Sequence, residues 1–248
     1  MEIIWQISQE DIDKVKAFAM LHDNNSFVQN RIKRNVDNTR EPVTIDVFWE
    51  RHVACLAATQ QRSGPGSLVA QFLKSGSILL VYQGCLGKDA LEQFAQRELS
   101  HYRLRRSNTI AKELVQNIVF IRNNWSTMKE RIDDIVDNPS PQTERKAAAY
   151  IQNNLKGFGP KQSRNLLQSL GITRYEVPID SRITKWLNEF GFPVYLTAAA
   201  LGDSSYYDFI SDGFQQLAKA CGLFPCVLDA IIFSSYDNGG WTTDNIVW

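Results

Sequence analysis

Apolar residues recur at three- and four-residue spacing along much of the chain, which is the pattern of helices with one buried face. Residues 106–122 show it clearly, with Ile110, Leu114, Ile118 and Ile121 on one side. Apolar runs and the breaks between them predict further helices over 11–21, 141–154, 160–170, 181–190, 203–221 and 224–236. The chain is therefore expected to be all-α.

Prolines and polar caps mark several of the predicted boundaries. Pro-Ser-Pro at 139–141 ends one helix and begins the next. Residues 177–179 are extended, because a residue before proline avoids the helical region, and Asp180 then caps a helix. Two short segments, 42–48 and 78–82, have the character of strands.

Composition limits the classes of function. The 248 residues carry 27 Lys and Arg against 27 Asp and Glu, so the net charge is zero. This argues against a binder that works by bulk positive charge and leaves room for a local basic face. The chain shows no signal peptide and no apolar run of about 20 residues, so we expect a cytoplasmic protein without a membrane partner. Four cysteines lack the spacing of a zinc or iron–sulfur site, and we expect reduced thiols at Cys55, Cys85, Cys221 and Cys226.

The sequence LKGFGPK at residues 155–161 predicts a tight turn between two helices. Gly157 and Gly159 permit the turn, and Pro160 fits a first helical position, where its missing N–H costs nothing. Such a turn directs the N–H groups of the second helix outward, where they can hold a phosphate. The same residues also suit an ordinary helical hairpin with no ligand.

A second feature accompanies the turn. Lys161 is followed 19 positions later by Asp180, in the segment VPIDSRI. This pairing resembles the helix–hairpin–helix DNA glycosylase superfamily, and most closely its 8-oxoguanine branch. The resemblance implies an all-α fold of two helical lobes with the active-site cleft between them. It implies a core over 51–248 with the hairpin at 155–161, and an N-terminal accessory segment over 1–50.

In that family the hairpin lysine is the nucleophile and the aspartate assists it, which implies these roles for Lys161 and Asp180. A neutral lysine amine attacks the sugar C1′, and the resulting Schiff base also permits strand cleavage at the abasic site. The carboxylate stabilises positive charge on the sugar as the base departs. Without the resemblance, Lys161 reads as a solvated lysine and Asp180 as a plain helix cap, and the capping role fits either reading.

Two polar segments resemble the parts of the family that open the duplex. Tyr102 and Arg103 correspond to the wedge that replaces a flipped base, and Gln60, with Gln61 and Arg62 beside it, to the residue that fills the gap. Each segment also reads as a solvated helix end. The resemblance further implies DNA-backbone contacts from Gly157, Gly159, Arg105, Arg106, Arg164 and Arg182, the last standing where the family has histidine.

The expected base pocket departs from the family. Phe233 stands where an aromatic ring stacks on the extruded base, but Asp229 replaces a glutamine, Asn165 a thiol and Ser169 a thioether. Asp229 can only accept hydrogen bonds, so it suits a base that offers donors. The substrate is then 8-oxoguanine or a similar base, or a bulky base such as the glucosylated hydroxymethylcytosine of phage DNA, whose removal would be antiviral defence.

The resemblance also bears on cofactors and partners. It implies no iron–sulfur cluster and no metal held by side chains, and a cation on the main-chain carbonyls of Asn153, Leu155 and Phe158. The expected partner is double-stranded DNA containing a modified base, bound by a monomer. A non-catalytic hairpin module that only binds DNA is the rival reading, and the tail 241–248 either closes the pocket or packs against the core.

Overall fold

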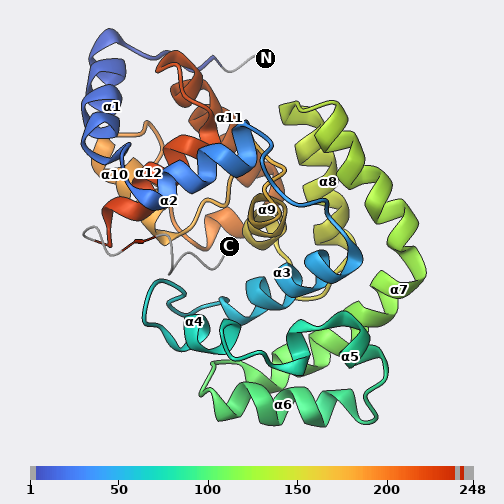
Figure 1. Ribbon diagram of the computed structural model, residues 1–248. Coiled ribbons are helices and arrows are strands. Elements are labelled where there is room, and N and C mark those ends of the chain that lie inside the picture. The colour runs from blue at the N-terminus through green and yellow to red at the C-terminus, as the bar shows by residue number, and fades with distance from the viewer. Residues whose placement is uncertain (1–3, 238–240, 243–248) are drawn as a thin grey trace.

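The structure is a computed structural model that describes residues 4–237, 241 and 242. Over these residues it consists of helices and connecting loops, without a strand, so the all-α prediction is confirmed (Figure 1). The α-helices are α1 (Gln9–His22), α2 (Ser26–Arg31), α3 (Ile45–Ala57), α4 (Leu68–Leu73), α5 (Tyr82–Leu86), α6 (Leu91–His101), α7 (Ser107–Asp137), α8 (Pro141–Asn154), α9 (Pro160–Ser169), α10 (Ser181–Phe190), α11 (Ser204–Ala220) and α12 (Pro225–Ser235). A π-helical turn, η1 (Ile32–Val36), and two 3₁₀ turns, η2 (Ile78–Leu80) and η3 (Ala200–Gly202), complete them.

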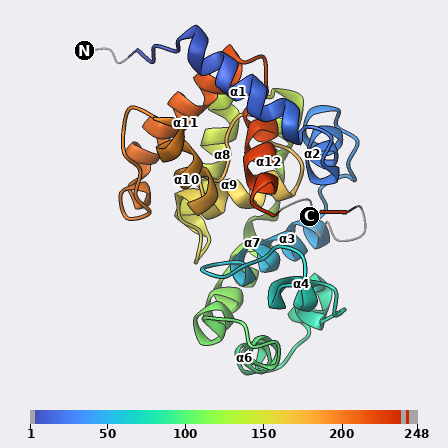
Figure 2. The same ribbon diagram turned by 90° about the vertical axis from the view of Figure 1, so that its left-hand side faces the viewer.

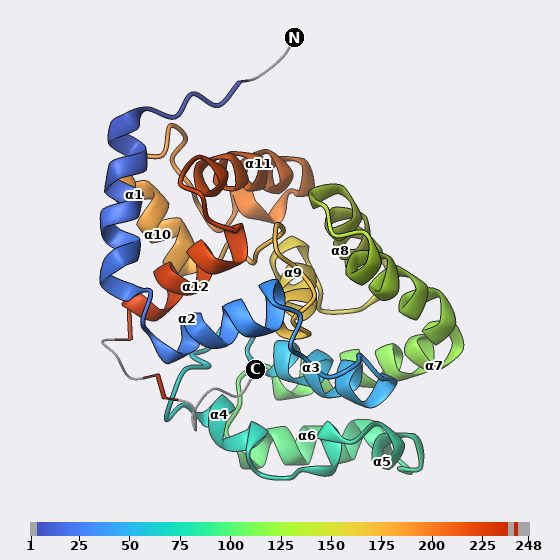
Figure 3. The ribbon, with the colours of Figure 1, turned by 45° about the horizontal axis from the view of Figure 1, so that its top comes forward.

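The helices form two lobes, each with its own apolar core (Figure 2). The core of the first lobe is built by a continuous stretch of chain, from Val43 before α3 to Ile172 after α9. The core of the second lobe joins α1 and α2 to α10, α11 and α12. Figure 3 shows α9 between the two groups, so the hairpin helix lies where the lobes meet.

The N-terminal helices are part of the second lobe. Phe27 and Val28 of α2 are buried in the same core as Leu228 and Ile232 of α12. The expected boundary at residue 50 falls inside α3, and α1 and α2 complete a core that the C-terminal helices begin.

The two predicted strands are wrong. Thr44 caps α3 by accepting a hydrogen bond from the amide of Val47 at 3.2 Å, so most of 42–48 is helical or a helix cap. Residues 78–82 form η2 and the start of α5. A short apolar run does not distinguish a strand from a helical turn, and in each segment a few residues, such as Phe48 and Leu79, are buried beside exposed ones.

The predicted helices are otherwise present, with one extension. The helix expected over 106–122 continues as α7 to Asp137 and changes direction at Asn124, whose backbone is not helical. Within the described part of the chain, no single helix has the length and hydropathy of a membrane span, although α11 and α12, bent by 95° at their junction, reach them together.

Candidate active site

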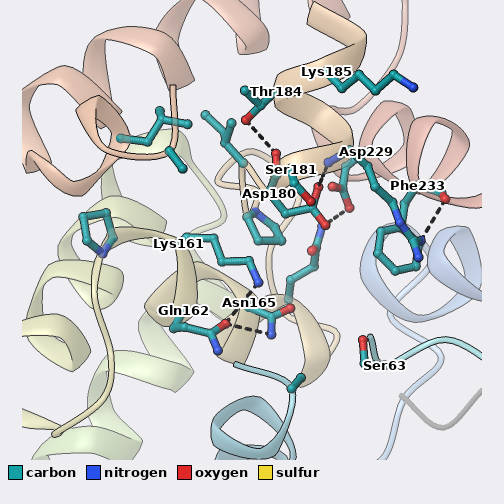
Figure 4. A pocket seen from close by; sticks show the side chains of 18 of the residues that line it. Ser63, Lys161, Gln162, Asn165, Asp180, Ser181, Thr184, Lys185, Asp229 and Phe233 are labelled. Atoms are coloured by element: carbon teal, nitrogen blue, oxygen red, sulfur yellow. Dashed lines mark hydrogen bonds between the residues drawn. The ribbon is translucent and has the colours of Figure 1, made fainter. Parts of the chain in front are cut away.

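A cleft of about 1190 Å³ receives side chains from both lobes. Lys161 and Asp180 line it, and Figure 4 shows them around one space with Asn165, Asp229 and Phe233. The remaining predicted residues that line the cleft are Gly159, Ser169, Arg182, Gln60, Gln61 and Arg62. The cleft thus brings together residues that are far apart in the sequence, as the hairpin motif predicted.

Lys161 lies in the first turn of α9, directly after the hairpin. Gly157 has φ +84°, and a Cβ placed there would lie 2.5 Å from Leu56 Cδ2 and 2.7 Å from Glu113 Oε2, so the turn needs glycine. Gly159 is exposed, and a Cβ there would meet nothing within 4 Å. The open side of Gly159 and the N-terminus of α9 therefore leave room for a phosphate beside Lys161.

The amine of Lys161 contacts a neutral acceptor. It donates to Oε1 of Gln162 at 3.3 Å. The amide nitrogen of Gln162 donates to the carbonyl of Cys55 and to Oγ1 of Thr59, each at 2.7 Å, which fixes the side chain and turns its oxygen to the lysine. Asn165 donates to the same oxygen at 3.3 Å. Gln162 is thus a site residue that the motif did not reveal.

Asp180 caps α10, as the sequence predicted. Its Oδ1 accepts from the amides of Arg182 at 2.8 Å and Ile183 at 3.0 Å. No hydrogen bond joins Oδ2 to any residue that the structure describes. One oxygen thus fixes the carboxylate, and the other remains available to the cleft that Asp180 lines.

Buried side chains hold the segments that carry Lys161 and Asp180. The Tyr207 hydroxyl accepts from the amide of Ile179 at 2.6 Å and donates to the carbonyl of Val177 at 2.9 Å. Arg164, whose guanidinium lies 4.4 Å from the centre of the Tyr207 ring, donates to the carbonyl of Pro160 at 3.0 Å. Arg164 therefore holds the residue before Lys161, and Tyr207 holds the residues before Asp180. These two side chains contact each other.

Arg164 is 3% exposed and fully engaged. Besides Pro160 it pairs with the buried carboxylate of Glu176 and, at 2.6 Å, with Asp208. This overturns the expectation that Arg164 contacts the DNA backbone, because its guanidinium faces the interior. No pattern near Arg164 in the sequence indicates this, because its acidic partners lie in a loop and in α11.

A second buried carboxylate, Glu144 of α8, holds the same loop. It accepts from the amides of Arg174 at 2.7 Å, Tyr175 at 2.8 Å and Glu176 at 2.7 Å. Burial raises the pKa of Glu144 to about 7, against these amide hydrogen bonds, which lower it. The chain from Gly171 to Asp180 is thus fixed at both its start and its end.

Asp229 lines the inner end of the cleft, and one of its two oxygens is already engaged. Its Oδ2 accepts from Arg31 and from Gln168, each at 2.9 Å. Burial raises the pKa of Asp229 to about 6, and the positive charge of Arg31 opposes this shift. The sequence analysis missed these two donors, and the expectation that Asp229 accepts hydrogen bonds from a base now concerns Oδ1 alone and stays a prediction.

The two small polar residues of α9 are also engaged. The Ser169 hydroxyl donates to the carbonyl of Leu166 at 2.7 Å, and its own carbonyl accepts from Arg34. Asn165 lies near the buried thiol of Cys55, with 3.3 Å between its Nδ2 and the sulfur. Ser169 therefore offers the cleft little beyond its small volume, whereas Asn165 retains its amide oxygen.

Phe233 has two neighbours over its ring. Phe27 stacks on it with ring centres 5.2 Å apart, and the guanidinium of Arg182 lies 3.9 Å from its centre. Arg182 also pairs with Asp237 at 2.9 Å, so a phosphate contact by Arg182 would compete with this ion pair. Trp241 is buried against Phe27 at 4.6 Å, which settles the packing of the first tail residue; 243–248 lie outside the described residues.

Comparison with solved structures relates this architecture to known proteins. The 8-oxoguanine DNA glycosylase of Thermotoga maritima is 13% identical, with 92% of this chain and 96% of that chain covered at a TM-score of 0.65. The Methanocaldococcus jannaschii 8-oxoguanine DNA glycosylase is 18% identical, with 92% and 94% covered at 0.66. An 8-oxoguanine glycosylase/lyase of the same organism, in complex with a 15mer DNA containing 8-oxoguanine, is 16% identical, with 92% and 100% covered at 0.69.

The chain has the helix–hairpin–helix DNA glycosylase fold. No family model matches its sequence, and no curated protein matches it either. The shared fold covers 92% of the chain, more than residues 51–248 alone supply, which are 198 of 248 residues. The glycosylase fold therefore extends into the N-terminal helices.

Within this glycosylase fold, the two segments expected to open the duplex lie against each other. The amide of Arg105 donates to the side chain of Gln61 at 3.1 Å, and its guanidinium to the carbonyl of Gln60 at 3.2 Å. Gln60 and Arg103 are exposed, each with positive φ, on adjoining turns. Their roles as wedge and gap filler stay predictions.

Two other residues expected to contact DNA, Tyr102 and Arg106, are less exposed than Gln60 and Arg103. Tyr102 is partly buried against Phe72, with ring centres 5.4 Å apart. Arg106 pairs with Glu113 at 3.2 Å. Among the described residues no group of three or more His, Cys, Asp or Glu side chains could hold a metal, and the cation on the hairpin carbonyls stays a prediction.

Proposed function

We propose that this protein is a DNA glycosylase that flips a modified base out of double-stranded DNA and removes it. The supporting observation is the placement of Lys161 and Asp180 on one cleft, with their segments held by the same buried cluster. The similar solved structures add that their proteins are named 8-oxoguanine DNA glycosylases, one of them in complex with DNA.

The chemistry follows from the groups at the cleft. The lone pair of Lys161 Nζ bonds to C1′ of the sugar, the N-glycosidic bond breaks, and its electrons leave with the base, which takes up a proton. The carboxylate of Asp180 stabilises the positive charge that develops on the sugar. The amine loses a proton, the bond from C1′ to the ring oxygen opens with its electrons on that oxygen, and the oxygen takes up a proton to become a hydroxyl. A protonated Schiff base remains.

A lyase step is the natural sequel to this intermediate. Loss of a proton from C2′ of the Schiff base expels the 3′ phosphate and cleaves the strand. We propose that the protein has this second activity, because a lysine nucleophile passes through the intermediate that permits it. The printed name of one similar structure, a glycosylase/lyase, supports the same reading.

The substrate class is either 8-oxoguanine and similar bases or a bulky base such as glucosylated hydroxymethylcytosine, which would make the protein an antiviral enzyme. The third candidate, a DNA-binding module without catalysis, would need neither Lys161 nor Asp180.

A labelled duplex panel tests the proposal. It carries 8-oxoguanine, other oxidised bases, hydroxymethylcytosine, glucosylated hydroxymethylcytosine, or an abasic site, each incubated with saturating protein and borohydride. We expect a trapped covalent adduct with the wild type that Lys161→Gln abolishes and Asp180→Asn weakens. Lys156→Gln is the matched control, because this exposed hairpin lysine is held by its main chain alone. DNA binding without an adduct on any duplex would favour the non-catalytic module.

A further inference from the structure

The inner end of the cleft has an excess of cationic donors. Arg31 at the end of α2 and Arg34 in η1 both line the cleft at this end. The carboxylate beside them is that of Asp229. Arg31 pairs with Asp229 at 2.9 Å. Arg34 donates to the main-chain carbonyl of Ser169, and in the described part of the chain no carboxylate pairs with it. One positive charge therefore lies at this end without an acidic partner.

The surroundings of Arg34 increase this excess. Burial, together with the nearby charges of Arg51, Arg31 and Arg40, lowers the pKa of Arg34 to about 10. Holding a partly buried guanidinium among other cations costs free energy, unless a group with acceptor atoms binds it. A ligand group with hydrogen-bond acceptors would therefore bind favourably at the inner end of the cleft.

We propose that Arg34, with Arg31 beside it, selects a flipped base whose substituent carries oxygen acceptors, such as a carbonyl, hydroxyl or carboxylate. This inference rests on the proposed glycosylase function and names its substrate class. A guanidinium has five N–H donors and no acceptor. It therefore binds a substituent that carries oxygen more tightly and forms no hydrogen bond with a methyl group. The pocket therefore reads acceptors on the base, the reverse of what Asp229 alone suggested.

A DNA phosphate offers the same acceptor chemistry from another source. If Arg34 binds a phosphate, its loss weakens binding to every duplex alike and reduces the salt dependence of binding. If it reads the base, affinity for a duplex with an abasic site is unchanged, because that duplex has no base to read. These two outcomes separate the sources.

The test compares pairs of bases that differ in oxygen: 8-oxoguanine with guanine, and 5-hydroxymethylcytosine and 5-carboxylcytosine with 5-methylcytosine. Single-turnover excision is measured for the wild type, Arg34→Met and Arg34→Lys. Arg131→Met, on α7 over the ring of Tyr150, is the control for loss of an arginine elsewhere. Thermal melting confirms that each variant is folded.

We expect the wild type to prefer the oxygen-bearing member of at least one pair. Arg34→Met should reduce excision of that member by about 10- to 100-fold, the range for a lost hydrogen bond from a charged donor. Arg34→Lys should restore part of the rate. Borohydride trapping on abasic DNA should stay within about twofold of the wild type for both variants.

Two results would overturn the inference alone. In the first, abasic DNA is trapped normally but Arg34→Met lowers excision of both members of a pair equally. In the second, Arg34→Met weakens binding to all duplexes alike, which assigns Arg34 to a phosphate. A wild type that forms no adduct on abasic DNA would instead overturn the proposed function, and the inference with it.

Discussion

The hydroxyl of Tyr207 accepts a hydrogen bond of 2.6 Å from the amide of Ile179, the residue that precedes Asp180. Tyr207 belongs to α11 and is completely buried, so the position of Asp180 is set from the interior of the second lobe. Arg164 packs on the same ring and binds the carbonyl next to Lys161. The positions of Lys161 and Asp180 relative to each other therefore depend on this buried contact.

Tyr207→Phe should leave the amide of Ile179 and the carbonyl of Val177 without their buried partner. We expect the free energy of unfolding to fall by about 1–3 kcal/mol. We also expect slower borohydride trapping on abasic DNA at saturating protein, with DNA affinity unchanged. Tyr206→Phe is the control, because the Tyr206 hydroxyl has no hydrogen bond to a described residue. Equal trapping rates in the two variants would show that Tyr207 does not position Asp180.

Arg164→Met should leave the buried carboxylate of Glu176 without its ion-pair partner Arg164. Removing one partner of a buried ion pair typically costs about 3–5 kcal/mol of stability, because the remaining charge stays desolvated. Denaturant unfolding measures this cost. Lys129→Met, which breaks an exposed pair with Asp133, should cost less than about 1 kcal/mol. Similar losses in both variants would contradict the structural role given to Arg164.

Glu144 predicts a pH dependence of stability. Burial raises the pKa of this carboxyl from 4.5 to about 7, so the folded protein holds the proton more tightly than the unfolded chain does. Between these values unfolding releases a proton, and the contribution of Glu144 to the free energy of unfolding falls as the pH rises. The stability of the wild type relative to Glu144→Gln should fall by about 3 kcal/mol from pH 4.5 to about pH 8.

Urea unfolding of both proteins across this range measures the difference, and Glu130→Gln controls for the loss of one exposed carboxyl on α7. A stability difference that stays constant with pH would show that folding does not raise the pKa of Glu144.

The two hairpin glycines should respond differently to alanine. Gly157→Ala combines φ +84° with a Cβ that lies 2.5 Å from Leu56, so we expect a loss of about 2 kcal/mol or more. Gly159→Ala meets open space and should change stability by less than about 1 kcal/mol. Thermal melting distinguishes them. A Gly159→Ala variant that keeps its stability but binds DNA more weakly would support a phosphate contact at this end of α9.

The sequence predicted the parts of the site that are local. Lys161 follows its hairpin directly, and Asp180 follows an extended segment, so turn and cap residues alone locate both. The helix pattern likewise predicted α8, α9 and α10 closely. These features depend on a few neighbouring residues, which a single sequence displays.

The rest of the site depends on contacts between distant segments. Arg31 reaches Asp229 from 198 positions away, and nothing near either residue in the sequence indicates the pair. Arg164 looks like a basic residue free to bind DNA until Glu176 is placed against it. The segments 42–48 and 78–82 form helical turns instead of strands, because the pattern of a short apolar run fits either structure.

The two lobes also differ in how much of the chain must be synthesised before each core can form. The core of the first lobe uses one uninterrupted stretch of chain, so it can fold as soon as that stretch has left the ribosome. The core of the second lobe joins α2 to α12, and Phe27 and Val28 lack their native partners until the last helix is made. A chain that stops short of α12 would therefore expose these apolar residues, which favours aggregation or degradation of the incomplete copy.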